Sequence, residues 1–264
     1  MASRDDIASL NKDFYLSKSA AAWYAEKEFV MPEEQAFLRD YELALKGCSL
    51  LDMGIGAGRT TRFLLPLVGD YRGFDYSEEM VRAAAARFPG VKIEERDARD
   101  LSAYGEASFD VVLFSFNGID CLSHQGRLQV MSEVKRVLKP GGIFAFSSHN
   151  REKPKTLPQD LSNLNRSKNP VRMIKNLIEY WQGIRNWKRS LHCAEETDSY
   201  ELRHDSSNGF KAPIYYIRKS HQVAQAATQG FAVEAIYNGK GQPTTVEESD
   251  TASSWIFYAC RKSA

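Results

Sequence analysis

The segment LLDMGIGAGRTT, residues 50–61, constrains the fold of this chain more than any other stretch. A short apolar run, residues 48–53, leads into a turn that contains Gly54, Gly56 and Gly58, and a helical pattern follows. Glycine lets the backbone of such a turn adopt left-handed conformations and lets a ligand approach it closely. A strand, a glycine turn and a helix in this order are typical of nucleotide-binding α/β folds. The segment therefore predicts a ligand at the end of a buried strand.

Predicted strands and helices alternate along the first 150 residues. The helical patterns repeat apolar residues every three or four positions, whereas the strands are short apolar runs. Strands are predicted at 71–76, 91–97, 109–116 and 143–149, and helices at 77–88 and 123–139. Such alternation predicts a parallel sheet with helices on both faces, whose ligands bind beyond the carboxyl ends of the strands.

Residues 151–192 interrupt this alternation and are strongly basic. They carry ten Lys or Arg and three Asp or Glu, which gives the insertion a net charge of +7 in a chain whose total is +1. Apolar residues at 171, 174, 177, 178, 181 and 184 form a helical stripe within it. We expect this stripe to be buried against its own domain, with the charges solvated and some of them facing an anionic substrate. Contact with a membrane surface or a nucleic acid is the alternative that a basic amphipathic helix leaves open.

The details of the glycine turn favour a cationic ligand over a pyrophosphate. The dinucleotide pattern G-x-G-x-x-G needs a small third residue, but position 59 is Arg and the third glycine is Gly58. Asp52 precedes the first glycine by two residues, and its carboxylate would repel a pyrophosphate. S-adenosylmethionine, which carries an ammonium and a sulfonium group, fits this environment.

Two further acids end the next two predicted strands. Asp75 is placed to accept hydrogen bonds from a ribose diol, as acids do in other doubly wound folds. Asp97 is placed to accept from an adenine amino group, while the backbone N–H of Ala98 donates to the ring. Tyr76 and Met80 are expected to flank the adenine ring.

These features together resemble the class I S-adenosylmethionine-dependent methyltransferases. The likeness covers roughly residues 20–150 and resumes at 215–231 and in a final hairpin. It implies an α/β, Rossmann-like sheet of seven strands with helices on both faces and a lid inserted after strand five. It also implies that the glycine turn, Asp75 and Asp97 bind S-adenosylmethionine, with S-adenosylhomocysteine as the product. Ile55 stands where the family usually has Gly or Cys.

The same resemblance assigns two more regions to the cofactor. An N-terminal helical segment closes over it in similar enzymes, often with a tyrosine, for which Tyr24 and Tyr15 are the candidates. Ser115 and Phe116 follow the fourth strand, where the family places the methyl group that is transferred. The expected organisation is a helical cap at 1–46, the cofactor-binding core at 47–150, a basic lid or substrate cap at 151–211 and the remainder of the core at 212–264.

Catalytic residues are harder to predict because a methyl group on a sulfonium is already activated. The enzyme has to align the nucleophile and exclude water, and it needs a base only where the nucleophile carries a proton. His149 and His124 lie at the predicted ligand side of the sheet and are the candidate bases, and Asn117 is a candidate for orienting the substrate. Candidate walls of the acceptor pocket are Tyr200, His204, Tyr215 and Tyr216.

The predicted function is methyl transfer to oxygen or nitrogen of a small molecule such as a natural product, sugar or metabolite. Residues 115–120 lack the Asn/Asp-Pro-Pro-aromatic tetrad of nucleobase amine methyltransferases, which argues against a nucleic-acid acceptor, and "SSHN" does not match metal-dependent catechol enzymes. We therefore expect no metal. The alternatives are an RNA or protein methyltransferase that docks through the basic insertion, a binding module without catalysis, and an NAD oxidoreductase.

The cellular location of the chain is predicted from sequence features that it lacks. The N-terminus lacks the apolar core of a signal peptide, and no apolar run reaches the length of a membrane span. The four cysteines are far apart and form no CxxC pair, which favours a reducing compartment. We expect a cytoplasmic protein without membrane insertion, either a monomer or a homodimer.

Overall fold

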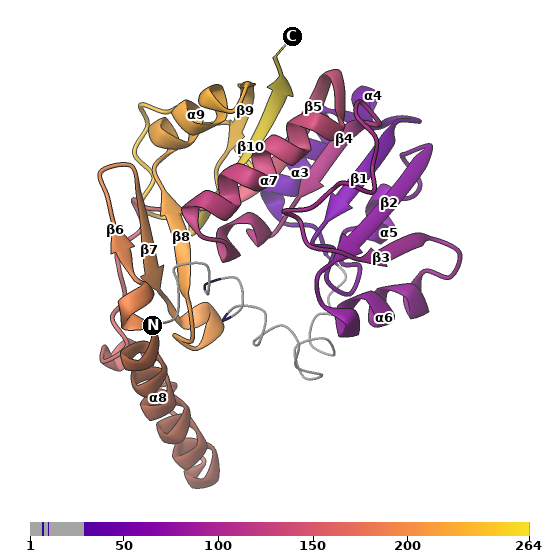
Figure 1. Cartoon of the computed structure of the whole chain (residues 1–264). Coiled ribbons are helices and arrows are strands. Elements are labelled where there is room, and N and C mark those ends of the chain that lie inside the picture. The colour runs from indigo at the N-terminus through magenta and orange to yellow at the C-terminus, as the bar shows by residue number, and fades with distance from the viewer. Residues whose placement is uncertain (1–6, 8–9, 11–28, 264) are drawn as a thin grey trace.

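The computed structural model describes residues 29–263, together with Ile7 and Leu10 (Figure 1). Tyr15, Tyr24 and most of the predicted N-terminal cap lie outside the described residues. The second half of that cap is helical as predicted, because α3 (Pro32–Asp40) and α4 (Glu42–Leu45) follow each other closely. Pro32 occupies the first turn of α3, where its missing N–H costs nothing.

Seven strands form the central part of the sheet, in the order β3-β2-β1-β4-β5-β10-β9. The first five pair in parallel, whereas β10 is antiparallel to both of its neighbours. The strands are β1 (Ser49–Met53), β2 (Asp70–Asp75), β3 (Lys92–Glu95), β4 (Phe109–Phe114), β5 (Leu138–Asn150), β9 (Phe231–Tyr237) and β10 (Trp255–Lys262). This arrangement confirms the predicted Rossmann-like α/β fold with its closing antiparallel pair.

Helices cover both faces of this sheet, as predicted. On one face, Phe37 of α3 and Leu64 of α5 pack with Leu50 of β1, and on the other Val134 of α7 packs with Leu51. Neighbouring residues of β1 thus enter different cores, which explains why the strand is apolar throughout. The remaining helices of the core are α5 (Thr61–Leu64), α6 (Glu78–Arg87), α7 (His124–Val137) and α9 (Lys219–Thr228).

Three further strands extend the sheet to ten in the described part of the chain, where the sequence predicted seven. They are β6 (Glu195–Glu196), β7 (Tyr200–His204) and β8 (Pro213–Ile217), joined in antiparallel pairs. β8 pairs with β5 only at His149 and Asn150, beyond Phe146, where the pairing of β4 with β5 ends. The predicted strand at 212–217 is β8, which joins this sheet through β5 and connects it to β7 and β6.

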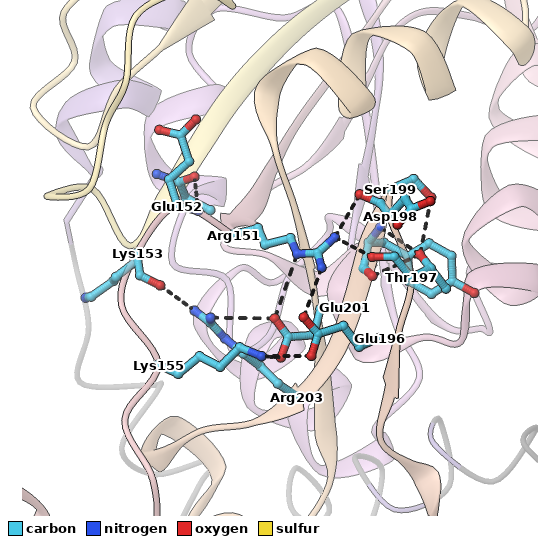
Figure 2. A network of polar contacts seen from close by, with 12 residues as sticks. Arg151, Glu152, Lys153, Lys155, Glu196, Thr197, Asp198, Ser199, Glu201 and Arg203 are labelled. Carbon is cyan, nitrogen blue, oxygen red and sulfur yellow. Dashed lines mark hydrogen bonds and ion pairs between the residues drawn. The ribbon is translucent and has the colours of Figure 1, made fainter.

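A buried glutamate ties the start of the insertion to the extension (Figure 2). Glu201 of β7 lies 2.5 Å from Lys155 Nζ and within 3.9 Å of the guanidinium groups of Arg151 and Arg203. Glu196 of β6 pairs with Arg151 and Lys155 from the solvent side, at 3.3 and 3.1 Å. Part of the basic charge that the sequence analysis expected to be solvated is therefore neutralised within the chain.

The helix predicted at 171–187 is α8 (Pro170–Ser190), which begins after Asn169 and projects away from the sheet (Figure 1). Its apolar stripe is exposed, with 59% of Ile174, 52% of Ile178 and 65% of Trp181 accessible to solvent. The expectation that this stripe is buried against its own domain is wrong. Other residues of the helix form its inward face, as described below.

Among the residues described in Figure 1, no helix combines the length and the apolar character needed to cross a membrane.

Candidate active site

The glycine turn after β1 has the left-handed backbone that its sequence predicts. Gly54, Gly56 and Gly58 have φ of +64°, +56° and +82°, a region that other residues rarely adopt. A Cβ on Gly54 would lie 2.8 Å from the Phe114 ring, and a Cβ on Gly58 would lie 2.6 Å from the Phe88 ring. These two glycines are thus required by contacts within the chain itself, a reason that the sequence analysis did not foresee.

Asp52 lies buried in β1 just before the turn. Its Oδ2 accepts hydrogen bonds from the hydroxyls of Thr60, at 2.9 Å, and Tyr71, at 2.8 Å. Burial of the carboxylate raises its pKa to about 7, and the two hydroxyls offset this only in part. A buried acid in this state favours a cation nearby, because a positive charge would restore its ordinary ionisation.

Asp75 ends β2 and contacts the turn directly. Its Oδ2 accepts from the backbone N–H of Gly56 and its Oδ1 from that of Ser77, both at 2.9 Å. Burial raises the pKa of this carboxyl to about 6. Each carboxylate oxygen has two lone pairs, so both can accept a further hydrogen bond from a diol. The residue is therefore held rigidly in the orientation that a ribose-binding acid needs.

The expected adenine-binding residues follow β3 and β2. Asp97 is about half exposed and pairs with Arg99, whose Nη2 lies 2.6 Å from Oδ2. Ala98 packs against the core, and Met80 is buried in the first turn of α6, where its N–H is capped by Ser77. Because β3, β2 and β1 are adjacent, the carboxyl ends of their strands bring Asp97, Asp75 and Asp52 to one edge of the sheet.

An ion pair that the sequence analysis missed locks the turn to the N-terminal helices. The guanidinium of Arg59 binds both carboxylate oxygens of Glu34, at 2.7 and 2.5 Å, and all but a few per cent of both side chains is buried. Ser115 Oγ donates to the same carboxylate, and the Phe116 ring lies 4.7 Å from the guanidinium. Arg59 is visible in the sequence, but there it indicates only a departure from the dinucleotide pattern G-x-G-x-x-G and does not predict an ion pair with Glu34.

The backbone after β4 is strained at two successive residues. Phe116 and Asn117 have φ of +54° and +61°, which costs about 1–3 kcal/mol for each residue that is not glycine. A hydrogen bond of 2.8 Å from the Asn117 N–H to Ser147 Oγ holds this conformation. Asn117 Oδ1 is buried and has no hydrogen-bond partner among the described residues. It is therefore available to a hydrogen-bond donor from outside them.

His149 is held by a buried aspartate that the sequence analysis did not identify. Asp120 Oδ2 lies 2.7 Å from His149 Nδ1 and 2.6 Å from the backbone nitrogen of the same residue. In the neutral tautomer that this contact favours, the ring proton lies on Nδ1 and Nε2 carries the lone pair. This is the arrangement by which an acid orients an imidazole as a general base. Asp120 stands five residues after Ser115, and the sequence analysis assigns it no role.

Arg127 of α7 completes the charge balance around Asp120. Both side chains are fully buried, and Arg127 Nη1 lies 2.5 Å from Asp120 Oδ1. The other donors of Arg127 bind Gln222, Gln225 and Ser148 Oγ, so the guanidinium has partners on three sides. A buried acid with these contacts remains fixed beside the imidazole.

The structure does not place His124 with this group. Its Nδ1 lies 2.8 Å from the hydroxyl of Tyr215, and its ring stacks on Tyr200 at a centroid distance of 4.3 Å. Burial and the charge of Arg127 lower the pKa of His124. Of the other candidate pocket walls, His204 is bound by Ser190 Oγ at 2.8 Å, and burial lowers its pKa to about 4.

Two aromatic rings lie beside the largely buried His149. Tyr216 lies 4.9 Å and Trp255 6.4 Å from its ring centroid, and Phe116 lies 5.9 Å from Trp255. The indole N–H of Trp255 donates to Glu33, a buried acid whose pKa is raised by burial. These rings can hold a planar substrate and exclude water from the imidazole. The described residues contain no group of three or more His, Cys, Asp or Glu that could hold a metal ion.

Comparison with known proteins identifies the part of the chain that carries this site. Residues 50–142 match the family model described as a methyltransferase domain. An uncharacterized methyltransferase of Bacillus subtilis, YcgJ, is 26% identical over 174 residues, which are 64% of this chain and 67% of that protein. A probable S-adenosylmethionine-dependent methyltransferase of Mycolicibacterium smegmatis is 33% identical over 128 residues, 46% of this chain and 48% of its own length. The matched region thus spans about half the length of the latter relative.

Solved structures match most of the chain in fold. The crystal structure of Burkholderia thailandensis 1,6-didemethyltoxoflavin-N1-methyltransferase, with bound 1,6-didemethyltoxoflavin and S-adenosylhomocysteine, has a TM-score of 0.64 and 12% identity. The match covers 100% of this chain and 92% of that one. A putative S-adenosylmethionine-dependent methyltransferase from Listeria monocytogenes gives a TM-score of 0.58 at 17% identity, over 88% of this chain and 97% of that one. At these identities the likeness concerns the fold alone.

Proposed function

Residues 50–142 form a methyltransferase domain of the class I, S-adenosylmethionine-dependent family, and from this premise we propose that the chain methylates an oxygen or nitrogen atom of a small molecule. The observation that carries the proposal is the contact between Asp120, in the helical turn after β4 (η1, Gly118–Cys121), and His149 near the end of β5. A base of this kind serves a nucleophile that must lose a proton, such as a hydroxyl, a phenol or an amide-like N–H.

S-adenosylmethionine, when bound, supplies a methyl group that is already activated. In our proposal the glycine turn provides room for the amino-acid tail of S-adenosylmethionine, and the Asp52 carboxylate balances the positive charge of this cofactor. Asp75 accepts from the ribose hydroxyls, while Asp97 and the Ala98 N–H contact the adenine between Tyr76 and Met80. The raised pKa of Asp52 and the fixed oxygens of Asp75 support this assignment, because both carboxylates gain by binding such a ligand.

The acceptor is proposed to lie against the aromatic rings of Phe116, Tyr216 and Trp255. There the Nε2 atom of His149 takes the proton of the nucleophile, and Asp120 stabilises the resulting imidazolium. Asn117 Oδ1 accepts a hydrogen bond from the molecule that receives the methyl group and so orients that molecule. The Burkholderia structure is that of an N1-methyltransferase with bound 1,6-didemethyltoxoflavin, and methyl transfer to a nitrogen of a small molecule is among the reactions that we propose for this chain.

An acceptor panel tests this function directly. The full chain is incubated with S-adenosylmethionine and small phenols, hydroxylated and N–H heterocycles, amines or sugars, and S-adenosylhomocysteine is measured. We expect product with at least one class of planar small molecule. Product formed only with transfer RNA, ribosomal RNA or protein would instead support docking of a macromolecule through the basic insertion. Tight cofactor binding without turnover on any acceptor would indicate a binding module.

The Asp75→Ala variant tests the cofactor assignment separately. Removing the carboxylate should weaken the binding of S-adenosylmethionine by about 1.5–3 kcal/mol, roughly 10- to 100-fold, because hydrogen bonds to a charged group are lost. Titration calorimetry measures the change. Asp70→Ala, at the opposite end of β2, is the matched control and should bind as the wild type does. Equal affinities of the two variants would exclude Asp75 from the ribose site.

A further inference from the structure

Exposed apolar side chains gather on one part of this molecule. Ten large apolar residues are exposed in the described chain, and eight of them lie between Leu157 and Leu191. Five of these belong to α8, the 21-residue helix that projects from the body (Figure 1). They are Val171, Ile174, Leu177, Ile178 and Trp181. A contiguous exposed patch of this kind marks an interaction surface.

The inward face of α8 is already occupied by its own chain. Tyr180 donates to the carbonyl of Gln159 at 2.6 Å, and Asn186 donates to that of Gly209 at 3.0 Å. Gly183 faces the Phe210 ring, which a Cβ would approach to 3.2 Å. The helix is therefore held in place by its polar and small residues. Its apolar stripe points the other way, and we call this stripe with the basic residues beside it the α8 surface.

The charge of the α8 surface has one sign. Between Arg166 and Ser190 the chain carries seven Lys or Arg and a single acid, Glu179, whose carboxylate lies 3.8 Å from Lys175. The basic residues of the helix are all exposed. Four of them flank or continue the apolar stripe, namely Lys175, Arg185, Lys188 and Arg189, whereas Arg172 lies on the opposite side of the helix.

We propose that the α8 surface binds an anionic lipid membrane, lying in the interface with its apolar stripe among the acyl chains and its basic residues at the headgroups. An amphipathic helix with aliphatic residues and Trp on one side and Lys and Arg beside them has the composition of interfacial helices. A symmetric contact between two copies would bring two clusters of like charge together, which opposes a dimer at this face. A nucleic acid would use the cations but leave the apolar stripe in water. The proposal is independent of the methyl acceptor.

Vesicle binding by the full chain tests the proposal. We expect co-sedimentation with vesicles that contain phosphatidylglycerol, and much weaker binding to vesicles of phosphatidylcholine alone. The double variant Ile174→Ser/Ile178→Ser should lose more than tenfold in affinity for the anionic vesicles. Lys188→Gln/Arg189→Gln should lose roughly fivefold for each charge removed. Leu43→Ser is the matched control, because Leu43 is 91% exposed on α4 and should not matter.

Three outcomes would overturn the proposal. The wild type could fail to bind either kind of vesicle, or the α8 variants could bind as tightly as Leu43→Ser. Sedimentation velocity could also show a dimer that Ile174→Ser/Ile178→Ser dissociates, which would assign the surface to a second copy. Titration with transfer RNA provides the remaining comparison, since tight binding that depends on Lys188 and Arg189 but not on the isoleucines would assign it to a nucleic acid. Circular dichroism of each variant shows that α8 is retained.

Discussion

His149→Ala is expected to lower the turnover of the chain by about 10²–10⁴-fold with any acceptor that must lose a proton, the range that general bases supply. The Asp120 carboxylate fixes the imidazole with Nε2 free, and alanine removes the only proton acceptor that this arrangement orients. Cofactor affinity should be unchanged, because His149 lies near the end of β5 whereas the acids assigned to the cofactor are carried by β1, β2 and the segment after β3. The measurement is S-adenosylhomocysteine formation with an acceptor identified from the panel.

The pH dependence distinguishes a base from a residue that only shapes the pocket. As pH rises, the acceptor ionises in solution and needs the base less, so the rate of His149→Ala should climb toward that of the wild type. A pocket defect would lower the rate equally at every pH. His124→Ala is the matched control, since its ring stacks on Tyr200 and its Nδ1 is bound to Tyr215. Wild-type rates in His149→Ala would exclude His149 as the general base. A loss of turnover confined to His124→Ala would assign that role to His124.

The sequence predicts those parts of the fold that depend on neighbouring residues. The glycine turn, the strand before it and the cap of α6 are local, because φ preferences, apolar runs and the Ser77 cap all act within a few positions. Asp75 could be predicted for the same reason, since the last residue of a parallel strand necessarily reaches the ligand edge of the sheet. These local rules predict that the acids at the ends of β1 and β2 and after β3 share one edge of the sheet, and the adjacent strands bring them there.

Long-range pairs could not be predicted in this way. The Arg59–Glu34 pair joins residues 25 positions apart, and Arg127 binds Gln222 across 95 positions. A charged residue on an amphipathic helix normally faces water, so Arg127 gave no sign that it would be fully buried. The periodicity of α8 showed which residues share a stripe but not whether the stripe faces the protein. That depended on Tyr180, Gly183 and Asn186, whose partners come from the loop before the helix and the turn after β7.

Arg127→Met is expected to destabilise the folded chain by about 3–5 kcal/mol, the cost of removing one partner from a fully buried ion pair. Methionine fills much of the volume but leaves the Asp120 carboxylate buried beside His149 without its countercharge. The Gln222 oxygen and Ser148 would also lose a donor. Urea denaturation measures the change, and Arg82→Met is the control, because the exposed Arg82 on α6 should leave the midpoint unchanged.

The double variant Arg127→Met/Asp120→Leu separates the charge from the packing. If the uncompensated carboxylate is the cause, removing it as well should restore most of the lost stability, because buried ion pairs and apolar pairs of similar volume are often equally stable. His149 would then keep its place in the fold but lose the acid that orients it, so this variant should be stable and still slow. A double variant that recovers both stability and turnover would show that neither folding nor turnover depends on the Asp120 carboxylate. Recovery of stability alone would assign Arg127 to folding and Asp120 to positioning the base.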